Sequence, residues 1–169
     1  MNDLGTVASS ELLTPEECLG LLSASIVGRV AFVGPHGLVL RPVNYRVVDG
    51  TVLFRSSSAG ALGDLVGHRD GVVFEVDHHA ALAPTGWSVL VRGACSVVSD
   101  PAVLASPGLE ALVVWASDAT DLVLAIQPDE VTGRRVGVHR RSEASGRTSQ
   151  VDRVDAPCRG CRVRRSVAT

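Results

Sequence analysis

The chain has 169 residues, a formal net charge of -2 and 46% hydrophobic residues. This composition excludes disorder throughout the chain, because global disorder requires low hydrophobicity and high net charge. No apolar run approaches the roughly 18 residues of a transmembrane helix, and the charge balance disfavours a generally basic nucleic-acid binder. All 16 basic residues are arginine, so the chain cannot form a lysine Schiff base.

The charges are unevenly distributed along the chain. Residues 1–139 contain 8 arginines and 15 acidic residues, a net charge of -7, and residues 140–169 contain 8 arginines and 3 acidic residues, a net charge of +5. The second segment contains no Leu, Ile, Phe, Trp or Tyr, so it has little apolar surface to bury. We therefore predict one folded domain over 1–139 and a disordered basic tail over 140–169, which we interpret as a solvated extension rather than a nucleic-acid-binding arm.

The N-terminal sequence and the cysteines favour a cytoplasmic protein. The opening residues MNDLGTVASSELL have neither the basic region nor the apolar region of a signal peptide, so we expect reduced thiols. Cys158 and Cys161 form a single Cys-x-x-Cys pair, which supplies only two of the four ligands of a structural zinc site. We predict no metal site, no membrane association and no nucleic-acid partner.

The local patterns predict strands joined by tight turns. The segment Thr14-Pro15-Glu16-Glu17 is a helix start with a capping box. Asp49-Gly50 between apolar runs is a hairpin signal, residues 60–67 are a short helix or loop, and Asp100-Pro101 begins a second helix. Gly93 within a long strand indicates a bulge. Strands are expected at 30–33, 38–45, 52–56, 71–77, 86–98 and 121–127, with 131–139 as a seventh strand or the end of the sheet.

Six or seven short strands with few helices are typical of a barrel. The predicted fold class is mainly β, a six-stranded antiparallel split β-barrel with a few short helices. No catalytic constellation is evident, because Ser88 lacks the Gly-x-Ser-x-Gly context of a nucleophile elbow. His78 and His79 are adjacent, so on a strand they point to opposite faces and cannot chelate one metal together.

A polar set on otherwise apolar strands is the candidate binding site. The strands joined by the Asp49-Gly50 turn carry Arg41, Asn44, Arg55, Ser56 and Ser57. Arginine and hydroxyl donors suit a phosphate group, and apolar strand residues beside them would cover a flat ring. The set therefore suits a phosphorylated ring cofactor. Ordinary outward-facing strand arginines remain an equal alternative.

Several strings in this sequence carry a resemblance to a known family. They are Gly28-Arg29-Val30-Ala31-Phe32, Pro42-Val43-Asn44-Tyr45, Asp49-Gly50, Phe54-Arg55-Ser56, Phe74-Glu75-Val76-Asp77, Gly86 to Gly93 and Val131 to Arg135. In this order and spacing, residues 10–139 resemble the pyridoxamine 5′-phosphate oxidase-like family, in its actinobacterial-type branch. The 140–169 tail has no part in the resemblance.

The resemblance implies an FMN-binding split barrel that forms a homodimer with flavin sites at the subunit interface. In that family the strand matching Arg41 to Tyr45 lines the flavin ring, and the strand end matching Phe54 to Ser57 lies near the phosphate and ring. Trp87, Ser88 and Trp115 match positions that flank the cofactor, with packing as the alternative for the tryptophans. The expected cofactor-binding residues are Arg41, Pro42, Val43, Asn44, Phe54, Arg55, Ser56, Ser57, Leu62, Trp87, Ser88 and Trp115.

One departure from the family pattern concerns the phosphate. The family commonly has a Gly-x-Lys whose lysine holds the phosphate, and this chain reads Gly60-Ala61-Leu62. Arg55, Arg41 or Arg69 would then have to replace the lysine, and losing one charge-assisted contact of roughly 1.5 to 3 kcal/mol weakens binding about tenfold to a hundredfold.

Two functions follow from the resemblance and the departure from it. The first is a cytoplasmic, homodimeric FMN-dependent oxidoreductase acting on a small organic substrate, with deazaflavin as the alternative cofactor. The second is a non-catalytic ligand-binding or sensor barrel holding deazaflavin, haem or weakly bound FMN. The basic positions of a vitamin B6 oxidase site are not evident, so pyridoxamine phosphate oxidation is not predicted.

Overall fold

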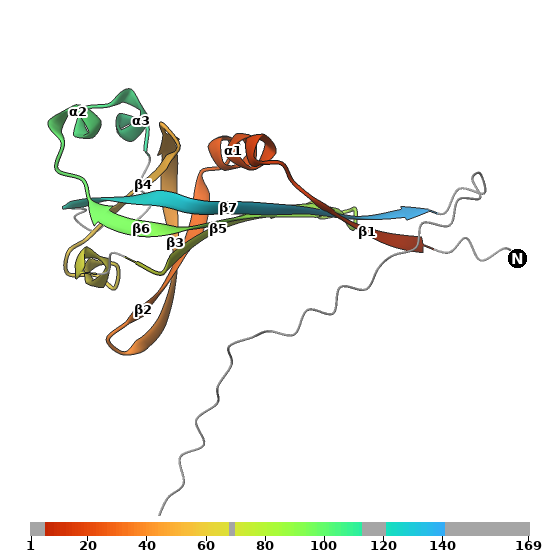
Figure 1. Ribbon diagram of the computed structural model, residues 1–169, viewed down its shortest axis with the longest axis horizontal. Helices are drawn as coiled ribbons and strands as arrows, with labels where there is room; N and C mark the ends of the chain where they lie inside the picture. Colours follow the sequence, from red (N-terminus) through yellow and green to blue (C-terminus); the bar gives the residue numbers. More distant parts are fainter. Residues whose placement is uncertain (1–5, 68–69, 113–120, 141–169) are drawn as a thin grey trace, which may run out of the picture.

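The computed structural model describes residues 6–67, 70–112 and 121–140 (Figure 1). The first half contains β1 (Thr6–Leu12), α1 (Pro15–Ala24), β2 (Val27–Gly34), β3 (Gly37–Val48), β4 (Thr51–Ser56) and the 3-10 helix η1 (Gly63–Gly67). The second half contains β5 (Val72–His79), β6 (Gly86–Val97), α2 (Pro101–Leu104), α3 (Pro107–Glu110) and β7 (Leu122–Arg140). Within these residues no helix is both long and apolar enough to cross a membrane.

The strands form one antiparallel sheet that closes on itself. Its order is β1-β7-β4-β3-β2-β5-β6, with an additional pairing of β6 to β7. Six of the seven strands therefore form a ring, and β1 lies outside it. The mainly-β split barrel predicted from the sequence is confirmed.

Strand β7 organises the barrel because it pairs with three other strands. Val52 to Ser56 of β4 pair with its first residues, Thr6 to Leu12 of β1 pair with its last residues, and β6 runs along its other edge. The separate strands expected at 121–127 and 131–139 are thus one strand of 19 residues. Together β6, β7 and β1 extend away from the barrel as a long arm (Figure 1).

Two glycines make room for close contacts in the barrel. The register of β6 against β7 shifts between Arg92 and Gly93, which confirms the predicted bulge. A Cβ atom on Gly93 would lie 2.0 Å from the backbone oxygen of Gln127. A Cβ atom on Gly28 would lie 2.2 Å from Cζ of Phe74, so Gly28 provides the space for a core aromatic ring.

The barrel core is built from alternate strand residues and plugged by α1. The rings of Tyr45 and Phe74 meet edge to face, with centroids 4.7 Å apart. Helix α1 begins with the predicted capping box between Thr14 and Glu17. The Tyr45 hydroxyl donates a hydrogen bond of 2.6 Å to the backbone oxygen of Leu22 in α1. This buried contact fixes the helix over the core.

A smaller apolar cluster lies outside the barrel, beneath α2 and α3. It contains Leu53, Leu109, Leu112 and Val123. The single helix expected after Asp100-Pro101 is two short helices, because Pro107 cannot continue a helix and instead starts the next one. The tail is expected over 140–169, but Arg140 is the last residue of β7. Residues 141–169 lie outside the described residues, so their disorder stays a prediction.

Candidate cofactor site and outer face

The barrel is split where β3 and β4 separate. Residues 37–44 of β3 pair with β2, whereas residues 45–48 pair with β4. The last pair of the β3–β4 ladder is Tyr45 with Phe54. One step further, Asn44 and Arg55 flank the separation, and Arg55 continues instead along β7 opposite Val123. The structure therefore brings the predicted Asn44 and Arg55 to the same break in the sheet.

Alternation along the two strands divides the predicted site residues between two faces. Tyr45 and Phe54 are fully buried, so Asn44 and Arg55, one residue away, point to the outer face. Pro42 shares that outer face by the same alternation, and Ser57 directly follows the end of β4. Arg41 lies on the opposite side of β3 and is exposed, although its cross-strand partner Val30 is buried.

Four of the predicted residues are buried side chains. Val43, Phe54 and Leu62 belong to the barrel core, and Ser56 is 7% exposed. A cofactor lying at the outer face would meet these positions through their backbone groups. The packing shows which of the predicted residues present side chains outward, and their role in binding stays a prediction.

The turn after β4 is held closed by a carboxylate. Asp121, directly before β7, accepts a hydrogen bond of 2.7 Å from the backbone N–H of Ser58 and a second bond from its hydroxyl. These bonds, the side-chain bond foremost, lower the pKa of Asp121. The Ser57 hydroxyl accepts from the N–H of Ala59, and the Ser57 carbonyl accepts from Gly60. Several donors of this turn are thus already used inside the chain.

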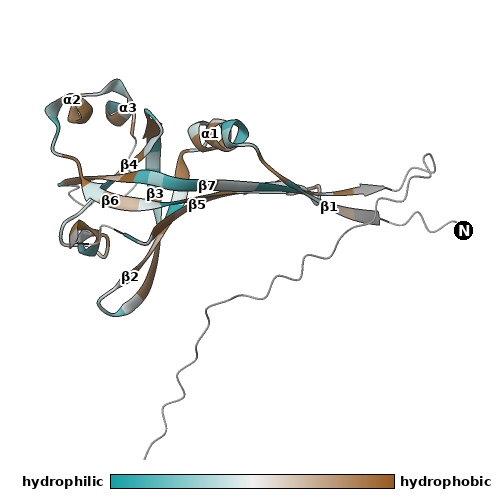
Figure 2. Ribbon diagram, in the orientation of Figure 1, coloured by the Kyte–Doolittle hydropathy of each residue, from teal (hydrophilic) through white to brown (hydrophobic). Residues whose placement is uncertain are grey.

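The outer face of the β2–β3 hairpin is rich in exposed apolar side chains. Paired Val33 and Leu38 are 65% and 79% exposed, and Leu40 is 54% exposed. In Figure 2 this projecting hairpin is coloured largely hydrophobic on both strands. We call Val27, Val33, Leu38 and Leu40 the outer apolar face. Isolated exposed leucines are ordinary, but contiguous apolar patches mark interaction sites.

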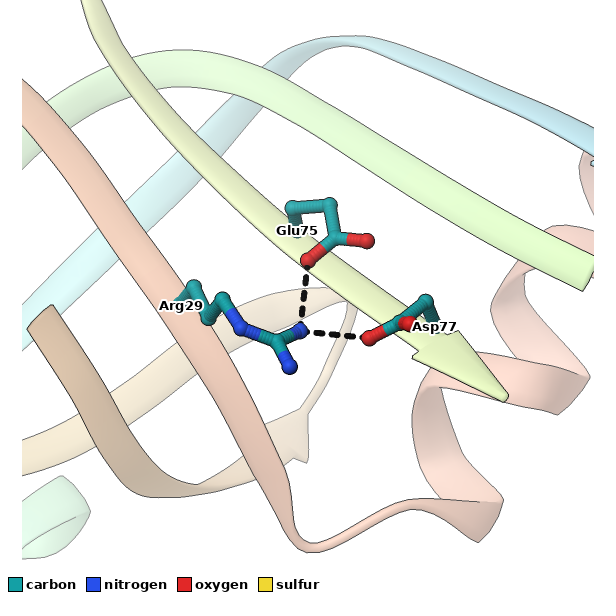
Figure 3. Close-up of polar contacts among 3 residues, drawn as sticks. All are labelled: Arg29, Glu75 and Asp77. Atoms are coloured by element: carbon teal, nitrogen blue, oxygen red, sulfur yellow. Dashed lines mark hydrogen bonds and ion pairs between the residues drawn. The ribbon is translucent and has the colours of Figure 1, made fainter. Parts of the chain in front are cut away.

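The charges beside the outer apolar face are paired within the chain. Arg29 of β2 reaches across to two carboxylates of β5, with Nη1 3.0 Å from Glu75 Oε2 and also bonded to Asp77 (Figure 3). The hydrogen bonds that Arg29 donates, the one to Asp77 first, raise the pKa of Arg29. Glu75 and Asp77 are two residues apart on β5 and share one face of it, and Arg29 neutralises part of their charge.

A pocket of about 140 Å³ lies on the β6–β7 arm. Ser88 pairs with Arg134 across the strands, and Leu12 of β1 lies beyond Arg134. The pocket wall combines the exposed Ser88 with Leu12, Leu90, Thr132, Gly133 and Arg134. Trp87, one residue from Ser88, instead packs against the barrel core.

The predicted residues therefore fall into separate groups. Asn44 and Arg55 flank the β3–β4 separation, whereas Ser88 lies on the arm and pairs with β5 and β7 rather than with β3 or β4. Trp115 lies outside the described residues, so its role stays a prediction.

Sequence reasoning missed Asp121 and the bridging role of Arg29, because their partners are 63 and at least 46 residues away. Among the described residues, no cluster of His, Cys, Asp or Glu is arranged to hold a metal ion.

Comparison with known proteins places this arrangement among related chains. Residues 14–135 match the family described as pyridoxamine 5′-phosphate oxidase. The uncharacterized protein Rv0080 of Mycobacterium tuberculosis is 37% identical over 134 residues, which are 77% of this chain and 88% of that protein. An FAD-binding protein from Mycobacterium smegmatis superposes with a TM-score of 0.62 at 32% identity, over 73% of this chain and 96% of its own.

A protein with a different ligand also shares the fold. The haem-binding protein from Mycobacterium smegmatis superposes with a TM-score of 0.57 at 17% identity, over 69% of this chain and 51% of its own. At that identity the likeness concerns the fold alone. Barrel architecture therefore does not by itself select the ligand.

Proposed function

Because the chain belongs to the pyridoxamine 5′-phosphate oxidase family, we propose that it is a flavin-binding protein that uses FMN for redox chemistry on a small organic substrate. The observation that carries the proposal is the placement of Asn44 and Arg55 at the β3–β4 separation. The FAD-binding relative at 32% identity supports a flavin. A cytoplasmic location is part of the proposal, since Cys18 and Cys95 are free thiols and disulfides are rare in reducing compartments.

The residues at the separation offer the contacts that a flavin phosphate and ring need. The Arg55 guanidinium would bind the phosphate through charge-assisted hydrogen bonds, and Pro42 and Asn44 would lie along the ring. Bound flavin supplies hydride and one-electron transfer, while the protein supplies binding and orientation. None of these side chains is assigned as a catalytic acid or base.

A homodimer is the second part of the proposal. The outer apolar face leaves Val33 and Leu38 more than half exposed in one chain. Burial of apolar surface against a second copy would be favourable, and the pairing of Arg29 with Glu75 and Asp77 lowers the penalty of covering nearby charges. In such a dimer, Ser88 and Arg134 of one copy would complete the flavin site of the other.

A non-catalytic ligand-binding barrel is the second candidate. The specific observation that favours it is the sequence Gly60-Ala61-Leu62. The family commonly has a lysine at the third of these positions, and that lysine binds the flavin phosphate. Leu62 is buried in the barrel core, so it offers no polar replacement. A haem-binding protein shares the fold, so haem is the alternative ligand to test.

Titration of the full chain with FMN, riboflavin and haem tests both candidates. We expect FMN to bind with quenching of its fluorescence, and Arg55→Ala to weaken FMN about tenfold to a hundredfold, because a charge-assisted hydrogen bond is lost. The affinity of Arg55→Ala for riboflavin, which lacks the phosphate, should be nearly the same as that of the wild type. Arg135→Ala is the matched control, since Arg135 is an exposed partner of Glu17, 3.4 Å away. Binding of haem without either flavin would favour the second candidate and reject the first.

A further inference from the structure

The donors of the turn after β4 have an internal anionic partner. Both the N–H and the hydroxyl of Ser58 donate to the Asp121 carboxylate. A backbone N–H together with a serine hydroxyl is a donor pair that also suits a phosphate oxygen. In this chain a side-chain carboxylate occupies the position that an anionic ligand group would take at this turn.

The location of this contact relates it to Arg55. Ser56 pairs with Leu122, and Arg55 pairs with Val123. Ser57 directly follows the end of β4, and Asp121 directly precedes β7, so both adjoin this last pair of the ladder. Arg55 and the competing Asp121 carboxylate thus belong to the same end of the β4–β7 ladder.

Other backbone donors of the turn are also bonded within the chain. Gly60 N–H bonds to the Ser57 carbonyl at 3.1 Å, and Gly63 N–H bonds to the Gly60 carbonyl at 2.8 Å. A Cβ atom on Gly63 would lie 2.1 Å from the Ser58 backbone oxygen. A ligand phosphate approaching Ser58 would therefore either displace Asp121 or lie beside its negative charge.

We propose that Asp121 is a specificity-determining residue that disfavours a terminal phosphate on the flavin by holding Ser58 and by like-charge repulsion. The inference rests on the proposed flavin function and concerns the same site. It assigns this chain a weaker preference for FMN over riboflavin than Arg55 alone would produce. Together with the absence of lysine, it makes the phosphate end of the site the least favourable part for FMN.

The test compares FMN and riboflavin on the full-length chain. Asp121→Asn removes the negative charge and retains an oxygen that can accept from Ser58. We expect FMN affinity to rise about tenfold, because a like charge near a phosphate is removed, while riboflavin affinity changes less than about twofold. Asp129→Asn is the matched control, since it removes one exposed carboxylate from β7 at another position.

The outcomes separate the two proposals. Equal changes for FMN and riboflavin, or no change for either, would overturn the role of Asp121 while flavin binding stands. Failure of both flavins to bind the wild type and every variant would reject the flavin function, and the role of Asp121 with it. Asp121→Ser is a second variant with the same expected selectivity, and it applies if Asp121→Asn does not give a cooperative thermal transition.

Discussion

The two faces of β2 have opposite surroundings, although their residues alternate along one strand. Val30 and Phe32 point inward and are 0% and 2% exposed, whereas Val33 points outward and is 65% exposed. The inner residues pack against partners from distant strands. The outer residues have equally apolar side chains, but no part of the described chain buries them to the same extent. The inner face thus contributes the core of the fold, whereas the outer face leaves apolar side chains exposed in one chain.

Of the changes that distinguish the inner face from the outer face, removal of a core ring should have the largest effect. Phe74→Ala should lower the free energy of unfolding by about 3 to 5 kcal/mol, because it leaves a cavity beside Tyr45 and Gly28. Urea unfolding followed by tryptophan fluorescence measures this loss. Leu82→Ala is the control, since Leu82 is fully exposed and should change stability by less than about 0.5 kcal/mol. A small loss at Phe74 would contradict its place in the core.

The core also predicts a loss of stability at high pH. Burial raises the pKa of Tyr45 to about 12 from the usual tyrosine value of 10.0. Since the folded pKa lies above the unfolded one, the stabilisation is complete below about pH 10 and is lost as pH rises toward 12, amounting to roughly 2 to 3 kcal/mol.

This ionisation is directly measurable because the chain contains one tyrosine. The tyrosinate absorbance of the native protein should titrate near pH 12. Unfolding measured at pH 9, 10 and 11 should show declining stability, with a smaller decline in Tyr45→Phe. Titration of the native protein near pH 10 would show that the hydroxyl is not buried as the structure indicates.

A charge placed on the outer apolar face should weaken the proposed dimer without lowering the stability of the monomer. Leu38→Asp would weaken the proposed dimer about tenfold to a hundredfold, because an unpaired charge would be buried at the interface. Its monomer should unfold much like the wild-type monomer. Sedimentation velocity across a concentration series measures the change, with Leu82→Asp as control. A dimer of unchanged affinity would place the interface elsewhere, and a monomeric wild type would reject the homodimer.

The smallest effect is expected at the paired charges. Arg29→Gln should cost at most about 1 kcal/mol in one chain, because exposed ion pairs contribute little and the Arg29 side chain is 47% exposed. Arg92→Gln, which breaks the exposed contact with Glu130 at 3.6 Å, is the matched control. Both are measured by urea unfolding at low protein concentration. A loss at Arg29 comparable to that of Phe74→Ala would show that the outer charges stabilise the fold as much as the core does.

Local sequence determined the features that depend on neighbouring residues. Thr14 and Glu17 specify the start of α1. Asp49 and Gly50 adopt positive φ values of 48° and 77° in the predicted hairpin turn, a conformation that Asp and Gly tolerate. Gly93 marks the bulge. These signals need only a few consecutive residues, because turn geometry and side-chain periodicity are local properties.

Only the tertiary structure decided which distant residues meet. It joined 121–127 and 131–139 into β7 and placed β1 on its edge, although residues 6–12 carry weak strand signals. It brought Asp121 to Ser58, and Arg29 to Glu75 and Asp77. It also placed the side chains of Val43, Phe54 and Leu62 in the core. Asn44 and Arg55 instead lie at the β3–β4 separation. The physical reason is that barrel closure sets strand register, and register determines which side chains share a face.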